Sequence, residues 1–160
     1  MISFLSFKQP LIYGLLALTI FLAAFIPRAV DINAYDTPDQ ILWVIRSEKF
    51  HEALTKLKFK ETAVAPHPGV VTLWLGAIDI WLTPNYATLS LAEKFFLFRS
   101  SSALFISFSL ALIFLLLIKV FQNTFIAATA SLFLALDPTL VALSRVFLFE
   151  HRESGLILTE

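Results

Sequence analysis

The stretch "QPLIYGLLALTIFLAAFIP", residues 9–27, carries no charged side chain. It approaches the roughly 20 apolar residues that an α-helix needs to cross the hydrocarbon core of a bilayer. A signal peptide has a shorter apolar core of about 7–15 residues and ends in small residues at a cleavage site. The sequence "FIPRAVD" at the end of this stretch is a poor cleavage site. We therefore predict a retained transmembrane helix here.

Two further segments are long and apolar enough to span. One covers residues 100–118 and includes "ALFISFSLALIFLLLI", and the other covers residues 120–144 and contains Asp137-Pro138. The proline should break or kink the helix that it enters. Near membrane depth the Asp137 carboxylate is costly, so it should face protein or water, and a functional role is the default interpretation. The predicted fold is an all-α integral membrane protein with about three spans.

Composition narrows the function classes. The chain is 58% hydrophobic and 15% charged, with zero formal net charge and no cysteine. This is too apolar for an ordinary soluble domain. A net charge of zero and the lack of a run of basic residues argue against a nucleic-acid partner. The lack of cysteine excludes disulfides and thiolate metal sites. The three histidines show no metal-ligand spacing, so neither a metal nor a cofactor is expected.

The orientation follows from two lysines. Lys8 precedes the first span, and Lys119 lies between the second and third. Short cytoplasmic loops carry an excess of Lys and Arg, whereas long loops cross largely regardless of charge. The long segment 28–99 is therefore predicted to be an extracytoplasmic loop.

Two amphipathic or interfacial helices are predicted inside this loop. Thr37 can cap the first, Pro38 suits its first position, and Gln40 completes a capping box. One face of this helix is apolar, which suits a helix lying in the membrane interface; it carries Trp43, Phe50, Leu54 and Leu57. The turn Pro66–Gly69 precedes the second helix, Val70–Leu82, which is too short to span.

The order of these motifs resembles a known family. It resembles the start of the GT-C membrane glycosyltransferases of the family 39 type, which include protein O-mannosyltransferases and bacterial aminoarabinose transferases of lipid A. The resemblance covers almost the whole chain but only the N-terminal portion of a family member. Its most specific part is the combination of "DQILWVIRS" with "HPGVVTLWLGA", joined by Asp137-Pro138 and Ser144-Arg145.

The resemblance implies a multi-pass enzyme of a bacterial inner or plasma membrane. Such an enzyme takes a sugar from a polyprenyl-phosphate donor and passes it to a lipid, glycan or protein acceptor at the extracytoplasmic face. Asp39 matches the family's catalytic aspartate, whereas Gln40 replaces the glutamate that usually follows it. Glu150 replaces an expected aspartate, and the final "HRESGLILTE" departs from the pattern. We therefore expect a truncated or fragmentary chain that is inactive alone, since three spans cannot easily enclose a catalytic cavity.

Each candidate residue also has an ordinary interpretation. Asp39 could act as general base, yet acidic residues in a first helical turn are common. Asp36 is the competing carboxylate and more simply supports the turn. His67, Arg46 and Arg145 could bind the donor phosphate. Alternatively, they are a turn residue, a snorkelling arginine and an interfacial anchor.

A non-enzymatic membrane protein is the other hypothesis, for example an assembly factor or a transporter subunit. That class predicts polar residues that face other spans and no cavity with an outer carboxylate. The outer Asp39 at a helix start and the His-Pro-Gly turn are the features that favour the enzyme.

Overall fold

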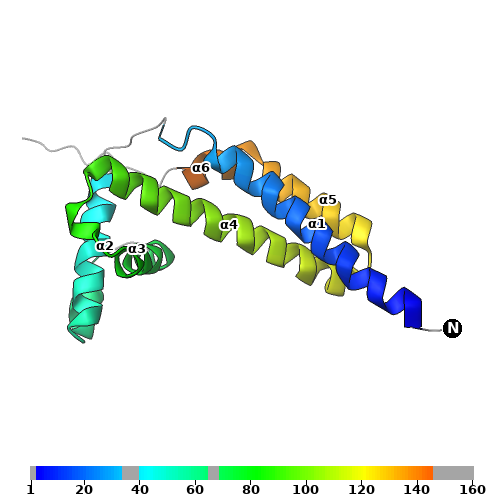
Figure 1. Ribbon diagram of the computed structural model, residues 1–160, viewed down its shortest axis with the longest axis horizontal. Coiled ribbons are helices and arrows are strands. Elements are labelled where there is room, and N and C mark those ends of the chain that lie inside the picture. The colour runs from blue at the N-terminus through cyan, green and yellow to red at the C-terminus, as the bar shows by residue number, and fades with distance from the viewer. Residues whose placement is uncertain (1–2, 34–39, 65–68, 146–160) are drawn as a thin grey trace, which may run out of the picture.

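The computed structural model describes residues 3–33, 40–64 and 69–145, with only the backbone for residues 3–8. Within these ranges the regular elements are all helices, as predicted (Figure 1). In chain order they are α1 (Ser3–Ala29), α2 (Gln40–Thr55), η1 (Phe59–Thr62), α3 (Val70–Leu82), η2 (Tyr86–Thr88), α4 (Leu91–Phe121), α5 (Thr124–Leu136) and α6 (Pro138–Arg145).

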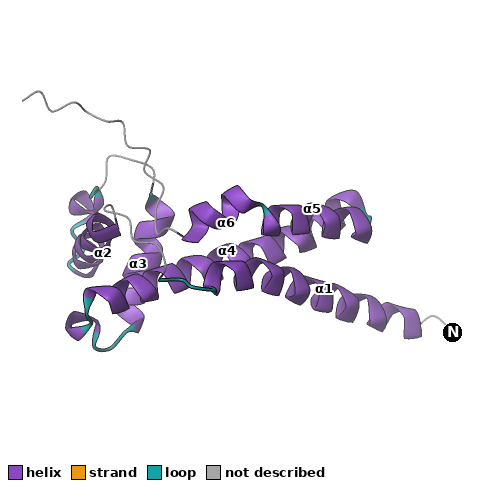
Figure 2. Ribbon diagram, turned by 90° about the horizontal axis from the view of Figure 1, so that it is seen from above, coloured by secondary structure: helices purple, strands orange, loops and turns teal. Residues whose placement is uncertain are grey.

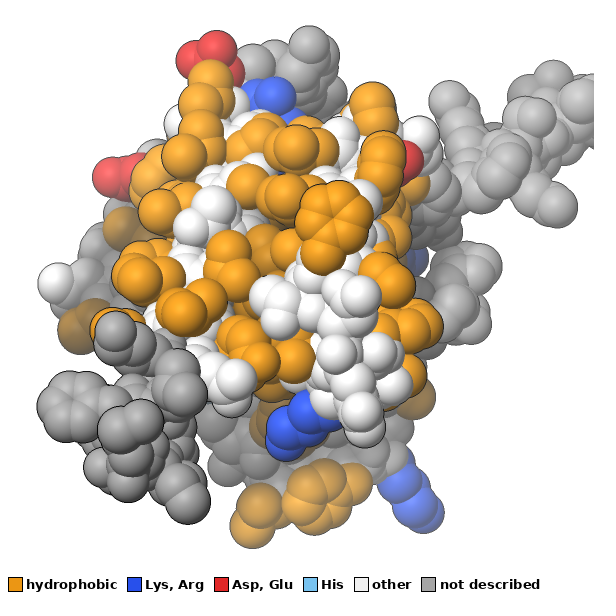
Figure 3. All heavy atoms as spheres, turned by 90° about the vertical axis from the view of Figure 1, so that its right-hand side faces the viewer, with side chains coloured by type: hydrophobic (Ala, Val, Ile, Leu, Met, Phe, Trp, Pro, Cys, Tyr) orange, Lys and Arg blue, Asp and Glu red, His pale blue; other side chains and the backbone are white. Residues whose placement is uncertain are grey.

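Helices α1, α4 and α5 form an elongated bundle (Figure 1). Two segments, Gln9–Ala29 and Leu91–Phe121, are long and apolar enough to cross a membrane. The bundle buries mainly small side chains where its helices touch, and exposes leucines and phenylalanines around them. From the end at which α1 begins, the surface is mostly apolar (Figure 3).

The helix that contains the second predicted span begins before that span. α4 starts at Leu91, ahead of the apolar run that begins at residue 100, because Ser90 and Glu93 form a capping box there. The Glu93 Oε2 accepts from the Ser90 backbone N–H at 2.7 Å, and the Ser90 Oγ accepts from the Glu93 N–H at 3.4 Å. Such reciprocal bonds satisfy backbone donors at a helix start. Its first turns therefore extend beyond the apolar run.

The predicted break at Asp137-Pro138 is confirmed. α5 and α6 are bent by 50° relative to each other, and together they make a third candidate span (Figure 2). Asp137 ends α5, and its Oδ1 accepts from the Leu140 backbone N–H at 2.7 Å. Proline at the first position of α6 suits a helix start, where its missing N–H costs nothing.

α2 and α3 lie across the Leu91 end of α4, and we call residues 40–64 and 69–90 the cap (Figure 1). The helix predicted at Val70–Leu82 is confirmed as α3. Trp43 and Phe50 belong to an aromatic core that the cap shares with α4, instead of lying open to the membrane interface as the sequence predicts. The exposed apolar side chains of the cap come mainly from α3, among them Val70, Val71, Trp74, Ile78, Trp81 and Leu82.

Two glycines let the cap helices approach closely. A Cβ on Gly69 would lie 2.5 Å from the Trp43 ring, and one on Gly76 would overlap the Ser47 side chain. A salt bridge then ties α2 to α4, with 2.8 Å between the Lys94 Nζ and the Glu48 Oε1. The cap is thus held to the bundle by both packing and charge.

Candidate functional site

Three arginines gather where α1 ends and α4 begins. Arg28 closes α1, Arg99 lies near the start of α4, and Arg145 closes α6. Each donates to backbone carbonyls in or beside the last residues of α1 and the loop that follows it. This end of the bundle is therefore rich in guanidinium groups, although the rest of the spans carry few charges.

Arg99 ties together the two flanks of residues 34–39. Its side chain is 2% exposed, and its Nη1 donates to the Ile32 carbonyl at 2.8 Å. Its Nη2 donates to the Gln40 Oε1 at 2.5 Å. Hydrogen bonds from a charged donor are stronger than neutral ones. The chain immediately before and immediately after residues 34–39 is thus fixed to one buried group.

Arg145 binds the same loop at the residues just before Ile32. Its Nη2 donates to the carbonyls of Val30 and Asp31, the latter at 2.9 Å. These bonds connect the end of α6 to the residues after α1, across most of the sequence. They give Arg145 an anchoring role, and its predicted contact with a donor phosphate stays a prediction.

Arg28 is the most deeply enclosed of the three, with a side chain that is 1% exposed. Its Nη1 donates to the carbonyls of Ala24 at 2.7 Å and of Ala135 at 3.0 Å. Its Nε and Nη2 have no hydrogen-bond partner among the described residues. No motif singles out Arg28 in the sequence, because an arginine at the end of a span is usually a simple interfacial anchor.

The predicted catalytic residue Asp39 and the predicted phosphate ligand His67 lie outside the described residues, as do Asp36, Thr37 and Glu150. Gln40 lies at the edge of this gap, and its side chain is buried with its Oε1 bound to Arg99. The structure therefore gives Gln40 a partner in α4, which the sequence could not reveal.

Arg46, the other predicted phosphate ligand, lies over an aromatic ring. Its guanidinium carbon is 4.7 Å from the centroid of Trp43, within the range of a cation–π interaction. Trp43 in turn packs on Gly69. The two motifs that carry the family resemblance thus contact each other through Trp43 and Gly69, and this contact also contributes to the packing of α2 against α3.

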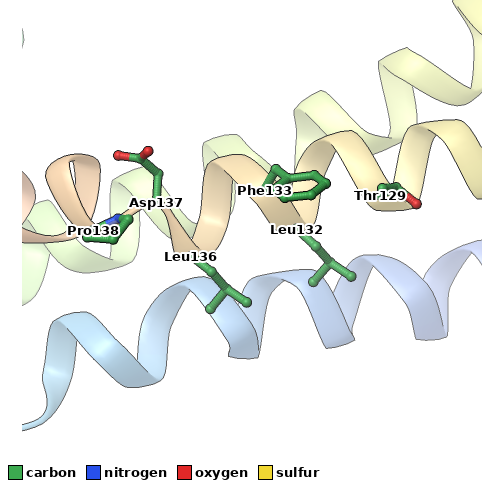
Figure 4. A pocket seen from close by; sticks show the side chains of 6 residues that line it. All are labelled: Thr129, Leu132, Phe133, Leu136, Asp137 and Pro138. Atoms are coloured by element: carbon green, nitrogen blue, oxygen red, sulfur yellow. The ribbon is translucent and has the colours of Figure 1, made fainter.

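Asp137 lies close to the end of a span. The carbonyl of Ala135 binds Arg28, which places the helix break level with the last turn of α1. The carboxylate points away from α1, whereas Leu132 and Leu136 point toward it (Figure 4). It lines an apolar pocket of about 510 Å³ beside Phe133. Its observed role is the cap of α6, and the predicted functional role stays a prediction.

A buried carboxylate outside the predicted site residues lies in the cap. The Oδ1 of Asp79 accepts from the Ser101 hydroxyl, and its Oδ2 has no hydrogen-bond partner within the described ranges. Burial raises the pKa of Asp79 to about 6. The sequence feature that could have indicated this residue is a single carboxylate in the otherwise apolar segment "VVTLWLGAIDIWL". Such a residue has to find a polar partner in the fold.

Among the residues that the structure describes, no three His, Cys, Asp or Glu side chains are grouped so as to hold a metal ion. The described residues of the candidate site offer guanidinium groups and backbone carbonyls. Arginines in this setting are suited to phosphate and carboxylate ligands.

The fold defines an all-α membrane protein with two helices able to span, or three if α5 and α6 form one bent span. No protein-family model, curated protein or solved structure matches the chain.

Proposed function

We propose that this chain belongs to a membrane glycosyltransferase that takes a sugar from a polyprenyl-phosphate donor at the extracytoplasmic face. The proposal starts from the resemblance of its motifs to the family 39 type of GT-C transferases. The structural observation that supports the proposal is the pair of hydrogen bonds that Arg99 donates to Ile32 and Gln40, on either side of residues 34–39. A catalytic group is most effective when neighbouring residues hold it in its productive geometry.

The positions of the arginines agree with a phosphorylated lipid donor. Arg28 and Arg99 lie in α1 and α4, the two helices long enough to cross the hydrocarbon core, and Arg145 ends α6, which with α5 makes the bent candidate span. Lipid phosphates lie at this level of a bilayer. Guanidinium groups bind phosphate oxygens with two parallel hydrogen bonds. A donor with its prenyl chain in the membrane could thus present its phosphate to this end of the bundle.

The chemistry assigned to Asp39 is general base catalysis. As a bond forms between the acceptor oxygen and the anomeric carbon, the bond from that carbon to the donor phosphate breaks. The acceptor proton passes to the Asp39 carboxylate, and polyprenyl phosphate leaves with the electron pair. A carboxylate at a helix start is favoured in its ionised form by the helix dipole, which keeps it available as a base.

The test separates donor binding from transfer. The chain in lipid nanodiscs is titrated with radiolabelled polyprenyl-phosphate sugars to measure donor binding. Transfer is followed in membranes of the cells that naturally produce the protein, because the chain alone is expected to be inactive. We expect Asp39→Asn to leave donor binding nearly unchanged and to lower transfer by about 100-fold, a typical contribution of a general base.

Asp36→Asn is the matched control, because it removes a neighbouring carboxylate and should retain transfer. A loss with Asp36→Asn and none with Asp39→Asn would move the base to Asp36. Absence of any donor binding by the wild-type chain would contradict the proposed function itself.

A further inference from the structure

α3 carries an apolar face that no other described part of the chain covers. Four apolar side chains recur along this face at helical spacing, each between 44% and 75% exposed: Val71, Trp74, Ile78 and Trp81. The one charged group of the helix, Asp79, lies on the other side, where it is bound by Ser101 of α4. Apolar residues at such spacing normally form the buried stripe of a helix. We therefore looked for what covers this face.

The contact with α4 places α3 at the edge of the apolar part of the span. Ser101, which donates to Asp79, is the second residue of the apolar run 100–118. The neighbouring Arg99 donates to the Ile32 carbonyl, just after the end of α1. The end of α1, the start of the apolar run of α4 and the centre of α3 thus lie at one level, where the hydrocarbon core begins.

The direction of α3 suits a helix that lies in the plane of a bilayer. It is seen end-on in Figure 1, in which α4 runs across the picture, so the two helices cross at a steep angle. α3 also lies closer to the rest of the bundle than α2 does (Figures 1 and 2). With α4 crossing the membrane, α3 lies along the surface of the hydrocarbon core and on the membrane side of α2.

The cap separates its charged and apolar surfaces in the same sense. Its exposed charged side chains all belong to α2 and the turn after it: Lys49, Glu52, Lys56, Lys58, Lys60 and Glu61. A helix at a membrane interface keeps its apolar face among the acyl chains and leaves charged groups in water. Tryptophan is enriched at this level of membrane proteins, and two of the three tryptophans lie on the face of α3. The distribution favours lipid as the cover.

The cap is hollowed beside this face. A pocket of about 270 Å³ between α2 and α3 has a mainly apolar lining, with two polar members: Leu54, Trp74, Ile78 and Trp81, with His51 and Thr55. A second pocket of about 410 Å³ shares Leu54 and Trp74 with the first. The Trp74 ring is held edge-on against Phe50, with 5.3 Å between the ring centroids. Hydrocarbon is the ligand that such walls accommodate best, because it gains by leaving water.

We propose that the exposed face of α3 is a lipid-binding surface that inserts into the leaflet on the side of the cap. The pocket between α2 and α3 takes an acyl chain of a lipid in that leaflet, against the Trp74 ring. The sequence assigns the interfacial position to the aromatic face of α2, but that face is buried in the cap. The lipid contact belongs to α3, and it does not depend on the proposed transferase activity.

The experiment measures tryptophan fluorescence in phosphatidylcholine nanodiscs. The lipid either is unmodified or carries bromine on its acyl chains near the glycerol, since bromine quenches a tryptophan that it touches. Trp81→Phe reports mainly on Trp74 in the pocket wall, and Trp74→Phe reports mainly on Trp81. The double variant leaves only Trp43, which is 1% exposed and serves as the matched internal control.

We expect brominated lipid to remove a large part of the emission of the wild type and of both single variants, and none from the double variant. Quenching of Trp81 without quenching of Trp74 would overturn the assignment of the pocket. Quenching by aqueous iodide in place of brominated lipid would mean that the face lies in water. Protection from both quenchers would mean that a protein partner or a second copy of the chain covers it. Either of these last two results would overturn the inference.

A second measurement leaves the tryptophans intact. The chain has no cysteine, so a nitroxide label can be attached at Val71→Cys on the face of α3 or at Lys49→Cys on the charged surface of α2. Oxygen concentrates in lipid, whereas a nickel chelate stays in water. We expect oxygen to relax the label at position 71 more strongly and the nickel chelate to relax the label at position 49 more strongly. Equal access of the nickel chelate to both positions would overturn the inference.

Discussion

The bundle and the cap differ in the side chains that they bury, although the bundle also encloses Ile20 and Phe114. The fully enclosed contacts of the bundle are made largely by small residues, among them Ala24, Ala103, Ala127, Ala135, Ser107 and Ser131, whereas Phe125 and Phe133 are more than three-quarters exposed. The cap instead encloses Trp43, Phe50 and Tyr86 with Phe98. In lipid, helices gain nothing by hiding large apolar groups, so they associate through small residues that allow close contact. In the cap, burial of aromatic area supplies the stability, as it does in water.

The largest expected effect comes from Trp43→Ala, which removes the centre of the aromatic core. Loss of a buried tryptophan costs about 3–5 kcal/mol. All three tryptophans of the chain, Trp43, Trp74 and Trp81, lie in the cap. Thermal unfolding in detergent, followed by the fluorescence of the remaining two, should show a strongly lowered midpoint for the cap.

Phe133→Ala is the matched change on the lipid-facing side of α5. It should alter stability by no more than about 0.5 kcal/mol, as expected of an exposed position. If both substitutions destabilise the protein equally, the bundle also depends on large apolar side chains and the contrast fails.

The next effect is a dependence of cap stability on pH through Asp79. Its pKa is raised from 3.8 to about 6 by burial, so the folded state holds the proton more tightly than the unfolded state. The contribution of Asp79 to the free energy of unfolding is therefore fully present below about pH 4 and is lost as pH rises through 6. The difference between the two pKa values corresponds to about 3 kcal/mol in the free energy of unfolding.

Fluorescence melting at pH 4.5 and 7.5 measures about 2 kcal/mol of this effect, because part of it is already lost at pH 4.5, and Asp79→Asn should flatten the difference. The comparison with this variant is needed because Glu52 and Glu93 are exposed acids with lowered pKa values and act in the opposite direction. A pH response that survives Asp79→Asn would assign it to other groups.

Glycine substitutions sharpen the comparison further. Gly76→Ala would force its Cβ against Ser47, and overpacking of this kind costs about 1–3 kcal/mol. Gly14 lies in α1 with no atom within 4 Å of an added Cβ, so Gly14→Ala should be neutral or slightly stabilising. The double variant Gly76→Ala with Ser47→Gly should recover much of the loss. If stability is not recovered, the contact between α2 and α3 is not the cause of the destabilisation by Gly76→Ala.

The smallest perturbation tests which side of the membrane each region faces. Lys58 in the cap and Lys119 at the end of α4 are both exposed, and the chain has no cysteine of its own. Cysteine at position 58 should react with an impermeant thiol reagent added from outside, and cysteine at position 119 should not. Reaction at 119 alone would reverse the orientation and remove the outer active site from the proposal.

The sequence predicts local features well. Hydropathy predicts the spans, the short apolar run predicts α3, and Asp137-Pro138 predicts the bend after α5. These features depend on neighbouring residues alone. The start of α4 at Leu91 was not predicted, because the polar capping box at Ser90 lies outside the apolar run.

The contacts of the candidate site depend on residues far apart in the chain, and sequence alone cannot give them. Nothing near Arg28 or Arg99 indicates that they turn inward. Ala135 and Ile32 accept through backbone carbonyls that carry no sequence signal, and the Gln40 side chain that Arg99 also binds is 59 positions away. The face of α2 with Trp43 and Phe50 was predicted to meet lipid. A tryptophan face suits either a membrane interface or a protein core, and the partner helix decides between them.

The bonds of Arg99 and Arg145 impose an order on biosynthesis. Arg99 is separated from Gln40 by 59 positions, and Arg145 is separated from Val30 by 115. At roughly 5–20 residues per second, a ribosome makes these later partners several seconds or more after the loop itself. The loop that precedes α2 therefore leaves the ribosome before either arginine exists to fix it. The site reaches its final shape only after α4, and then α6, have been made and inserted.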